Sequence, residues 1–357
     1  MIDKSGKSLE IKELSLEQRR YLIDTQQVYE AWRATENEFR RRFVGSMRWA
    51  ERNGTDYLLR KSGKAETSLG PRNAQTEAAY QAFHGGRDQS NSRLKSLAAR
   101  LDELAPVNVA LGLGRMPRVA AQIVRKCDEQ GLLGEQLLVL GTNAIYAYEA
   151  LAGVQVQSGL VATDDIDLLY DARRHISLAS RDFRASGLVG LLRKVDRSFS
   201  PVQPRAFRAA NDDGYLVDLI RPEAKNVFRD RRPAALTDLA DDLEAASIFG
   251  LDWLISSPRL EAVAIDERGY PARLVVIDPR AFALHKIWIS KRADREPVKA
   301  MRDVRQAEAV AAIATRYLRR PFDSSELDAL PKALRDLAPS LIKSGADHTE
   351  TSVRPNW

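Results

Sequence analysis

Apolar positions recur at helical spacing in the first part of the chain, and one segment of alternating pattern interrupts them. Between residues 15 and 43 the apolar side chains fall every three or four positions, which predicts one long amphipathic helix. The following segment alternates around Asn53-Gly54, a pair typical of a tight hairpin turn. Helical spacing resumes after Pro71 and continues through residues 91–104. We therefore predict a helical N-terminal module, residues 1–105, that carries a β-hairpin arm.

The middle of the chain mixes short apolar runs, which predict buried strands, with helical segments. The run Leu137–Leu140 predicts a strand that passes through Gly141 directly into a helix. Breakers at both ends of residues 105–117 predict a connector. The other predicted elements are helices at 117–131 and 179–195, strand within 154–171, strands on both sides of residues 212–214, and a hairpin at 260–277 that turns at residues 266–271. The fold class expected is α+β, with a small mixed sheet flanked by helices.

The last part of the chain is predicted to be helical. Helical patterns cover residues 280–291, 296–319 and 324–337, and the final residues are polar. We expect a domain over residues 106–278 that holds the sheet, a helical C-terminal domain over 279–340, and a polar tail over 341–357. No internal repeat is visible.

Composition limits the class of protein. A chain of 357 residues with 44% hydrophobic content suits two or three domains with sizeable cores. The single cysteine, Cys127, excludes an internal disulfide, and no Cys/His spacing is typical of a zinc site. No apolar run reaches the about 18 residues of a membrane span, and the first fifteen residues lack the apolar region of a secretory signal. We expect a cytoplasmic protein with no membrane partner.

Positive charge is concentrated in three segments, although the net charge is only +6. Residues 38–72 hold nine Lys or Arg against four Asp or Glu, residues 181–208 hold seven against two, and residues 279–305 hold eight against three. Such segments can attract a phosphorylated ligand or a nucleic acid, but they are equally typical of solvated helix faces. In the first segment Arg60, Lys61 and Arg72 are candidates to close over phosphates or an RNA backbone; a plain hairpin with solvated basic ends is the alternative.

Three acidic residues interrupt the apolar segment at 161–171. Because successive side chains of a strand point to opposite faces, Asp165 and Asp167 share a face and Asp164 lies on the other. Neighbouring carboxylates repel and are costly to bury, and a divalent cation such as Mg²⁺ relieves both penalties because it prefers oxygen ligands. A strand that leaves the core with its acids in water is the alternative.

Two further features strengthen the metal hypothesis. The turn Gly141-Thr142-Asn143 lets backbone approach a ligand, and free N–H groups at the start of the following helix favour phosphate. Asp218 interrupts another apolar strand, so a third carboxylate can complete a metal cluster or draw a proton from an attacking hydroxyl. The alternative for Asp218 is an edge-strand carboxylate paired with Arg221.

These residues resemble the signature of the DNA polymerase β-like nucleotidyltransferase superfamily. That signature is an apolar strand, Gly-Gly or Gly-Ser opening a helix, Asp-x-Asp/Glu on the next strand, and a later single Asp. Gly141 and Thr142, then Asp165 and Asp167, then Asp218 match it over roughly residues 136–220. The layout is closest to a poorly characterised bacterial branch and is similar, more distantly, to toxin-type nucleotidyltransferases of abortive-infection systems. Thr142 departs from the usual Gly or Ser, and the long gap from Gly141 to Asp165 must form an extra turn or strand.

The resemblance implies a function and further site residues. It implies transfer of a nucleoside monophosphate from an NTP to an acceptor hydroxyl, with Mg²⁺ or Mn²⁺ held by Asp165, Asp167 and Asp218 and phosphates at Gly141–Asn143. The toxin-type relatives suggest Lys286 as a triphosphate-neutralising residue and Asp303 as a residue that positions either this lysine or the acceptor; a surface ion pair between Lys299 and Asp303 is the alternative. The basic segments favour tRNA or another nucleic acid as the acceptor. A toxin-like role would add an antitoxin protein as partner.

Two other function classes stay open at this point. A glycosyltransferase also uses Asp-x-Asp to bind a metal–sugar-nucleotide complex, but the helical N-terminal part and the later Asp218 argue against it. The third interpretation is a nucleotidyltransferase-fold module without catalytic activity that binds RNA or a partner protein. Binding of NTP and Mg²⁺ without product formation would favour this third interpretation.

Overall fold

The computed structural model describes residues 11–63, 65–173, 181–224 and 234–346. The chain divides into two compact units. Residues 17–113 and 268–271 form the first, which we call the arm unit, and residues 1–16, 114–267 and 272–357 form the second, which we call the sheet unit. Each unit is described by itself, and the finer division into domains stays a prediction.

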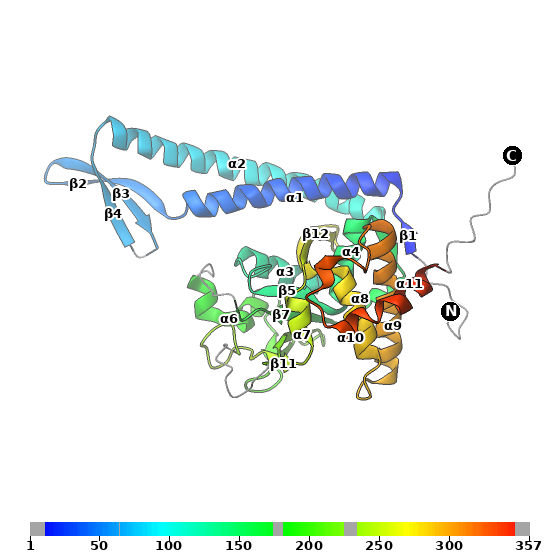
Figure 1. The fold of residues 1–357 in the computed structure, drawn as a ribbon. Helices are drawn as coiled ribbons and strands as arrows, with labels where there is room; N and C mark the ends of the chain where they lie inside the picture. Colours follow the sequence, from blue (N-terminus) through cyan, green and yellow to red (C-terminus); the bar gives the residue numbers. More distant parts are fainter. Residues whose placement is uncertain (1–10, 64, 174–180, 225–233, 347–357) are drawn as a thin grey trace, which may run out of the picture. The chain divides into compact units, whose positions relative to one another are not determined.

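The arm unit consists of two long antiparallel helices and a three-stranded sheet (Figure 1). Helix α1 spans Leu16–Arg42 and α2 spans Ala74–Ala110. Their pairing is fixed by buried polar contacts, because the amide of Asn108 donates to the hydroxyl of Thr25 over 3.1 Å. Strands β2 (Ser46–Arg52), β3 (Thr55–Ser62) and β4 (Ala65–Pro71) form an antiparallel sheet in that order. The predicted long helix and the hairpin at Asn53-Gly54 are confirmed.

Two features of the arm unit were not predicted. Strand β4 has a single large apolar side chain, Leu69, so alternation could not reveal a strand that is held mainly by backbone pairing with β3. The predicted connector at 105–117 is wrong in its first part, because α2 continues through Pro106 to Ala110. Burial of Leu104, Ala105 and Asn108 explains this continuation, since tertiary packing outweighs the hydrogen bond that proline removes.

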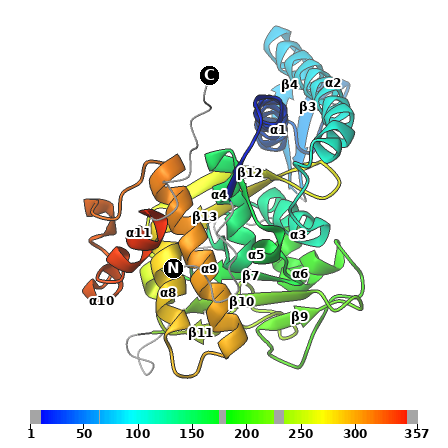
Figure 2. The same ribbon diagram turned by 90° about the vertical axis from the view of Figure 1, so that its right-hand side faces the viewer.

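A mixed sheet organises the sheet unit (Figure 2). Its order is β5 (Leu137–Leu140), β7 (Asp165–Tyr170), β10 (Leu216–Pro222), β9 (Arg208–Ala210) and β8 (Ser200–Pro201), and β11 (Ala246–Ile248) also pairs with β10. Strand β7 runs antiparallel to β5 and parallel to β10. Two small ladders complete the strands: β1 (Ile11–Glu13) with β6 (Val154–Val156), and β12 (Arg259–Ile265) with β13 (Pro271–Ile277).

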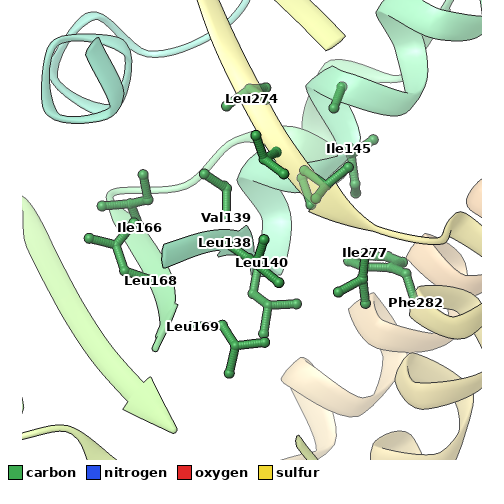
Figure 3. Packing of buried hydrophobic residues seen from close by; sticks show 14 of the residues in the cluster. Leu138, Val139, Leu140, Ile145, Ile166, Leu168, Leu169, Leu274, Ile277 and Phe282 are labelled. Atoms are coloured by element: carbon green, nitrogen blue, oxygen red, sulfur yellow. The ribbon is translucent and has the colours of Figure 1, made fainter. Parts of the chain in front are cut away.

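The sheet unit also contains nine described α-helices and three short helical segments. They are α3 (Arg118–Glu129), a 3₁₀ turn at Gly141–Asn143 that leads into α4 (Ala144–Ala152), α5 (Ser158–Val161), α6 (Arg181–Arg193), α7 (Leu251–Ile255), α8 (Pro279–Ser290), α9 (Pro297–Ala312) with a π-helical end at Ile313–Tyr317, a 3₁₀ turn at Ser325–Leu327, α10 (Lys332–Arg335) and α11 (Ala338–Ala346). Some of them pack on the sheet and others, such as α10 and α11, pack on helices α8 and α9. Figure 3 shows apolar side chains of β5, β7 and α4, among them Leu138, Ile166 and Ile145, in the core of the sheet unit. The predicted fold class, a small mixed sheet flanked by helices, is confirmed.

The C-terminal prediction needs correction. Residues 324–337 form a 3₁₀ turn and the short helix α10 rather than one helix, because Pro331 stands at the N-cap and interrupts the hydrogen-bond ladder. Helix α11 extends into the segment expected to be a polar tail, and it does so because Ala338 and Leu341 are buried. Among the described residues, no helix is long and apolar enough to cross a membrane.

Candidate active site

The three predicted carboxylates lie on one face of two neighbouring strands. Strand β10 pairs with β7 in parallel, in a register that sets Asp218 directly beside Asp167 and Leu216 beside Asp165. Since side chains alternate along a strand, Asp165, Asp167 and Asp218 share a face. Asp164 is exposed, in keeping with its predicted place on the opposite face. An extra turn or strand was predicted for the long segment between Gly141 and Asp165. This segment contains strand β6 and the short helix α5.

Gly141 has to be glycine because Asp167 lies against its backbone. Leu140 pairs with Asp167 across β5 and β7, and the chain turns at Gly141 with a positive φ of +62°. A Cβ atom at this position would stand 2.0 Å from Oδ2 of Asp167. The glycine turn and the carboxylate strand therefore meet, as the metal hypothesis required.

The electrostatics of Asp167 are those of a carboxylate in need of a counter-charge. Burial, together with the neighbouring charges of Asp165 and Asp218, raises the pKa of Asp167 to about 6. The positive charges of Lys286 and Arg208 act in the opposite direction and lower this pKa. Burial is the largest cause, so ionised Asp167 is costly in this position, and a divalent cation would offset that cost.

Hydrogen bonds of polar side chains hold the glycine turn against β7 and α9. The amide of Asn143 donates to the backbone carbonyl of Asp165 over 2.7 Å, which ties the turn to β7. The hydroxyl of Thr142 accepts hydrogen bonds from Gln306 at 3.2 Å and Arg302 at 3.3 Å, both on α9. The side chains of Thr142 and Asn143 are thus engaged within the protein, so we expect phosphate contacts to come from the backbone N–H groups of the turn. Their role in phosphate binding stays a prediction.

Asp218 is held by an arginine that the sequence did not reveal as a site residue. Arg208 lies opposite Asp218 in the β9–β10 ladder and donates two hydrogen bonds to the carboxylate, each of 2.6 Å. The alternative partner, Arg221, is instead directed to the hydroxyl of Ser247. Thr163 likewise donates to the carboxylate of Asp165. In the part of the chain that the structure describes, no three potential ligands are arranged around one metal position.

The donor set nevertheless fits Mg²⁺ in its chemistry. Asp165, Asp167 and Asp218 supply oxygen ligands from two adjacent strands, and the missing Cβ of Gly141 leaves room at Asp167. What prevents a cluster is the orientation of two carboxylates, since Asp218 faces Arg208 and Asp165 faces Thr163. Arg208 and Thr163 would therefore compete with an ion for these two carboxylates.

Lys286 and Asp303 form a buried pair between α8 and α9. The ammonium of Lys286 donates to Oδ1 of Asp303 over 2.8 Å, and Arg295 contacts the other oxygen over 2.6 Å. Asp303 is buried, with 2% of its surface exposed. The alternative pairing of Lys299 with Asp303 is absent, because Lys299 pairs with Glu296. The arrangement is the one expected of an Asp that positions a Lys beside the carboxylates.

A cavity of about 600 Å³ lies beside Asp167 and Lys286. Gly141, Asp167 and Lys286 line part of its wall, and aromatic side chains of α8 and of the segment after β11 line another part. The ring of His285 also borders the cavity, and burial lowers its pKa to about 3, so the imidazole is neutral at physiological pH. His285 is therefore unsuited to carry positive charge toward a phosphate.

The three basic candidates near the hairpin all belong to the arm unit. Arg60 donates to the carbonyls of Arg42 and Val44 and lies 4.0 Å from the ring centre of Phe83. Arg72 pairs with Asp56 and Glu77 and covers the ring of Trp49. The side chain of Lys61 is exposed. These contacts give Arg60 and Arg72 a part in holding the arm sheet together, and phosphate or RNA binding by the three residues stays a prediction.

Several residues at the site were missed by sequence reasoning. Arg208 could have been found, because a hairpin that turns at residues 211–214 sets position 208 opposite position 218. Gln306 could not, since its contact with Thr142 depends on how α9 packs against the glycine turn, and Arg295 could not, since its contact depends on the turn between α8 and α9. The aromatic wall of the cavity likewise arises from elements that are distant in sequence.

The mixed sheet, the glycine turn and the carboxylates on adjacent parallel strands define a nucleotidyltransferase type of architecture. A family described as Nucleotidyltransferase matches residues 118–331, more than half of the chain. The chain therefore belongs to this nucleotidyltransferase family, which supports an activity of the transferase type. The crystal structure of an antigenic nucleotidyltransferase-like protein from Paracoccidioides brasiliensis is similar at 17% identity, over 64% of this chain and 90% of that chain, with a TM-score of 0.30. No curated protein matches the chain.

Proposed function

We propose that the sheet unit transfers a nucleoside monophosphate from an NTP to an acceptor hydroxyl, with release of pyrophosphate. One observation carries this proposal: the paired register of β7 and β10 brings three carboxylates to one face, beside a glycine turn and a buried lysine. Structural acids rarely need such an arrangement, because each would be more stable apart from the others.

The residues have separable roles in this reaction. Asp165, Asp167 and Asp218 would hold Mg²⁺ or Mn²⁺, which supplies charge neutralisation and polarisation of the α-phosphate. The backbone N–H groups of the turn at Gly141 bind the terminal phosphates, and Lys286 offsets the triphosphate charge that remains. Asp218 draws the proton of the attacking hydroxyl onto its carboxylate once Arg208 releases it. Positioning and charge neutralisation account for most of such a reaction, so few residues suffice.

Nucleic acid is the acceptor class that charge favours. In the sheet unit, basic residues concentrate in the segments 181–208 and 279–305, which border β9 and include α8 and α9. Several of these residues pair with acids, as Arg205 does with Glu244 and Lys299 with Glu296, and the net positive charge that remains would attract a polyanion with a free hydroxyl, such as the end of a tRNA. Small molecules and protein hydroxyls are the competing acceptors, and the labelling experiment separates them.

Label transfer tests the proposal directly. The full-length protein is incubated with each α-³²P-labelled NTP, Mg²⁺ or Mn²⁺, and total RNA or cell lysate. Label is expected in RNA, with the donor identified by which NTP labels it, and the transfer should be lost in Asp165→Asn and Asp167→Asn with the fold retained by circular dichroism. Retained, metal-dependent transfer in Asp167→Asn would falsify the mechanism, and label in protein or small molecules would overturn the acceptor class.

A second candidate function rests on the contact between Arg208 and Asp218. A carboxylate that an arginine already occupies suits a module that binds nucleotide or RNA without catalysis. For such a module, NTP and Mg²⁺ bind, and no acceptor in a lysate becomes labelled. Arg208→Ala separates the two functions. An enzyme whose Asp218 is blocked by Arg208 would retain or gain transfer in this variant, whereas a binding module stays inactive.

A further inference from the structure

An exposed aromatic side chain lies on the wall of the cavity that holds Asp167 and Lys286. Phe249 is 55% exposed although it belongs to a cluster of aromatic rings. It follows β11 directly and lies near Trp253 and Trp288, with ring centres 5.6 and 5.9 Å away. The two tryptophans pack edge to face at 5.1 Å. Phe249 is thus supported from the protein side and open on the other.

The backbone is built to hold this ring in place. Gly250 has a positive φ of +91°, and a Cβ there would stand 3.2 Å from Trp288 and 3.3 Å from Trp253. Any other residue would be strained by its φ and would press on both indoles. The glycine therefore lets the chain carrying Phe249 lie close against the tryptophans. An exposed aromatic ring that is held in place by two tryptophans is suited to stacking with a planar ligand.

The cavity extends along helix α8 from the phosphate-binding groups to the aromatic ones. Lining residues run from Phe282 to Ile289, which corresponds to roughly 10 Å of helix. Lys286 lies between them, and Trp288 follows two positions later. A ligand whose phosphates contact Lys286 and Gly141 therefore has room to place a ring system against Trp288 and Phe249.

We propose that Phe249 and Trp288 form the stacking surface for the base of a purine nucleotide whose phosphates bind at Gly141 and Lys286. This inference rests on the proposed function, since it specifies the donor substrate of the same site. Stacking on an aromatic side chain strengthens with the ring area that overlaps, so a two-ring base gains more than a one-ring base. Arg292 also lines the cavity; it lies 5.4 Å from the ring centre of Trp288 and pairs with Asp294, so Phe249 offers the more open ring to the base.

Equilibrium binding to the full-length protein tests the inference without turnover. The probes are the α,β-methylene analogues of ATP, GTP, CTP and UTP, together with inorganic tripolyphosphate, all with Mg²⁺ and measured by calorimetry. Phe249→Ala and Phe249→Leu should weaken the purine analogues about tenfold or more, the usual effect of losing one stacking partner. Tripolyphosphate, which has no base, should bind both variants as it binds the wild type. Phe249→Trp should restore purine binding.

Matched variants keep the two proposals distinguishable. Lys286→Met should weaken tripolyphosphate and nucleotides together, because it acts on phosphates. If Lys286→Met has this effect while Phe249→Ala changes nothing, the stacking surface is refuted and the nucleotide site survives. If Phe249→Ala weakens tripolyphosphate equally, the ring supports the fold rather than a base, and the inference is again overturned. Stronger binding of the pyrimidine analogues overturns the purine assignment, and absence of binding by every probe overturns both proposals.

Discussion

Substitution of Gly141 by alanine separates backbone strain from damage to the site. The residue has φ +62°, a conformation that costs an L-residue about 1–2 kcal/mol, part of which is recovered because alanine restricts the unfolded chain. The new methyl would also stand 2.0 Å from Oδ2 of Asp167, well inside van der Waals contact. The carboxylate must therefore move by on the order of 1 Å, a displacement that can cost about 100-fold in rate when it affects a reacting group.

Gly131→Ala provides the matched control. Gly131 has a similar φ of +71°, and nothing lies within 4 Å of the position its Cβ would take. In urea titrations Gly131→Ala should lose about 1 kcal/mol of unfolding free energy, and Gly141→Ala should lose more than that. Mn²⁺ binding, followed by electron paramagnetic resonance, should weaken at least tenfold in Gly141→Ala and stay unchanged in Gly131→Ala.

The outcome that refutes this reasoning is specific. If Gly141→Ala binds Mn²⁺ and transfers label as the wild type does, then the close approach of the turn to Asp167 has no functional consequence. If both variants lose Mn²⁺ binding together, strain alone explains the effect and the clash with the carboxylate is irrelevant.

Three further substitutions probe charged groups of the sheet unit, two at the site and one, Glu149, on α4. Arg208→Ala should raise Mn²⁺ affinity several-fold, because the carboxylate of Asp218 becomes available as a ligand, and unchanged or weaker binding would contradict competition between arginine and metal. Asp303→Asn should lower the unfolding free energy by about 3 kcal/mol, because Lys286 loses its buried partner, and a loss below 1 kcal/mol in urea titrations would contradict burial of a functional ion pair. Burial raises the pKa of Glu149 from 4.5 to about 7. The unfolded chain therefore ionises first, and stability falls as the pH rises from 4.5 to about 7. Glu149→Gln should remove this loss, with a gain of roughly 3 kcal/mol at pH 8 and none at pH 4; a pH slope retained in the variant would assign it to another group.

Two other ion pairs on the same unit supply the controls. Arg205 pairs with Glu244, and its side chain is 78% exposed, so Arg205→Ala should leave Mn²⁺ affinity and stability nearly unchanged. Lys126 and Glu129 form a half-buried pair on α3, well away from Glu149 in sequence, and Glu129→Gln should not alter the dependence of stability on pH. A large effect of either control would show that charge in general, rather than the buried groups, governs the measurement.

Local patterns predicted the parts of the site that depend on one strand or one turn. The period of two placed Asp165 and Asp167 on one face, and the breaker after an apolar run placed Gly141 at a turn into a helix. Both features are set by steric rules that act within a few residues. The resemblance to a nucleotidyltransferase signature then joined Asp218 to them, which periodicity alone could not do.

Contacts between distant elements could not be predicted in the same way. The pairing of Lys286 with Asp303 was expected, but its second partner, Arg295, depends on the turn between α8 and α9. Phe249 gave no signal in the sequence, since an aromatic residue beside a glycine is more often part of a core. Helix α2 continues through Pro106 for a related reason: packing of residues far apart in sequence overrides a local rule.

The balance of charge around the cavity explains why cation and nucleotide should bind together. Asp165, Asp167 and Asp218 contribute three negative charges, and Arg208 offsets one of them by direct contact. The buried network of Lys286, Asp303 and Arg295 carries a net positive charge of one, so the whole group stays negative before any ligand enters. A triphosphate alone would be repelled by the carboxylates even as Lys286 attracts it. One divalent cation reverses the sign of the group, and the affinity for nucleotide should therefore rise steeply with the concentration of Mg²⁺.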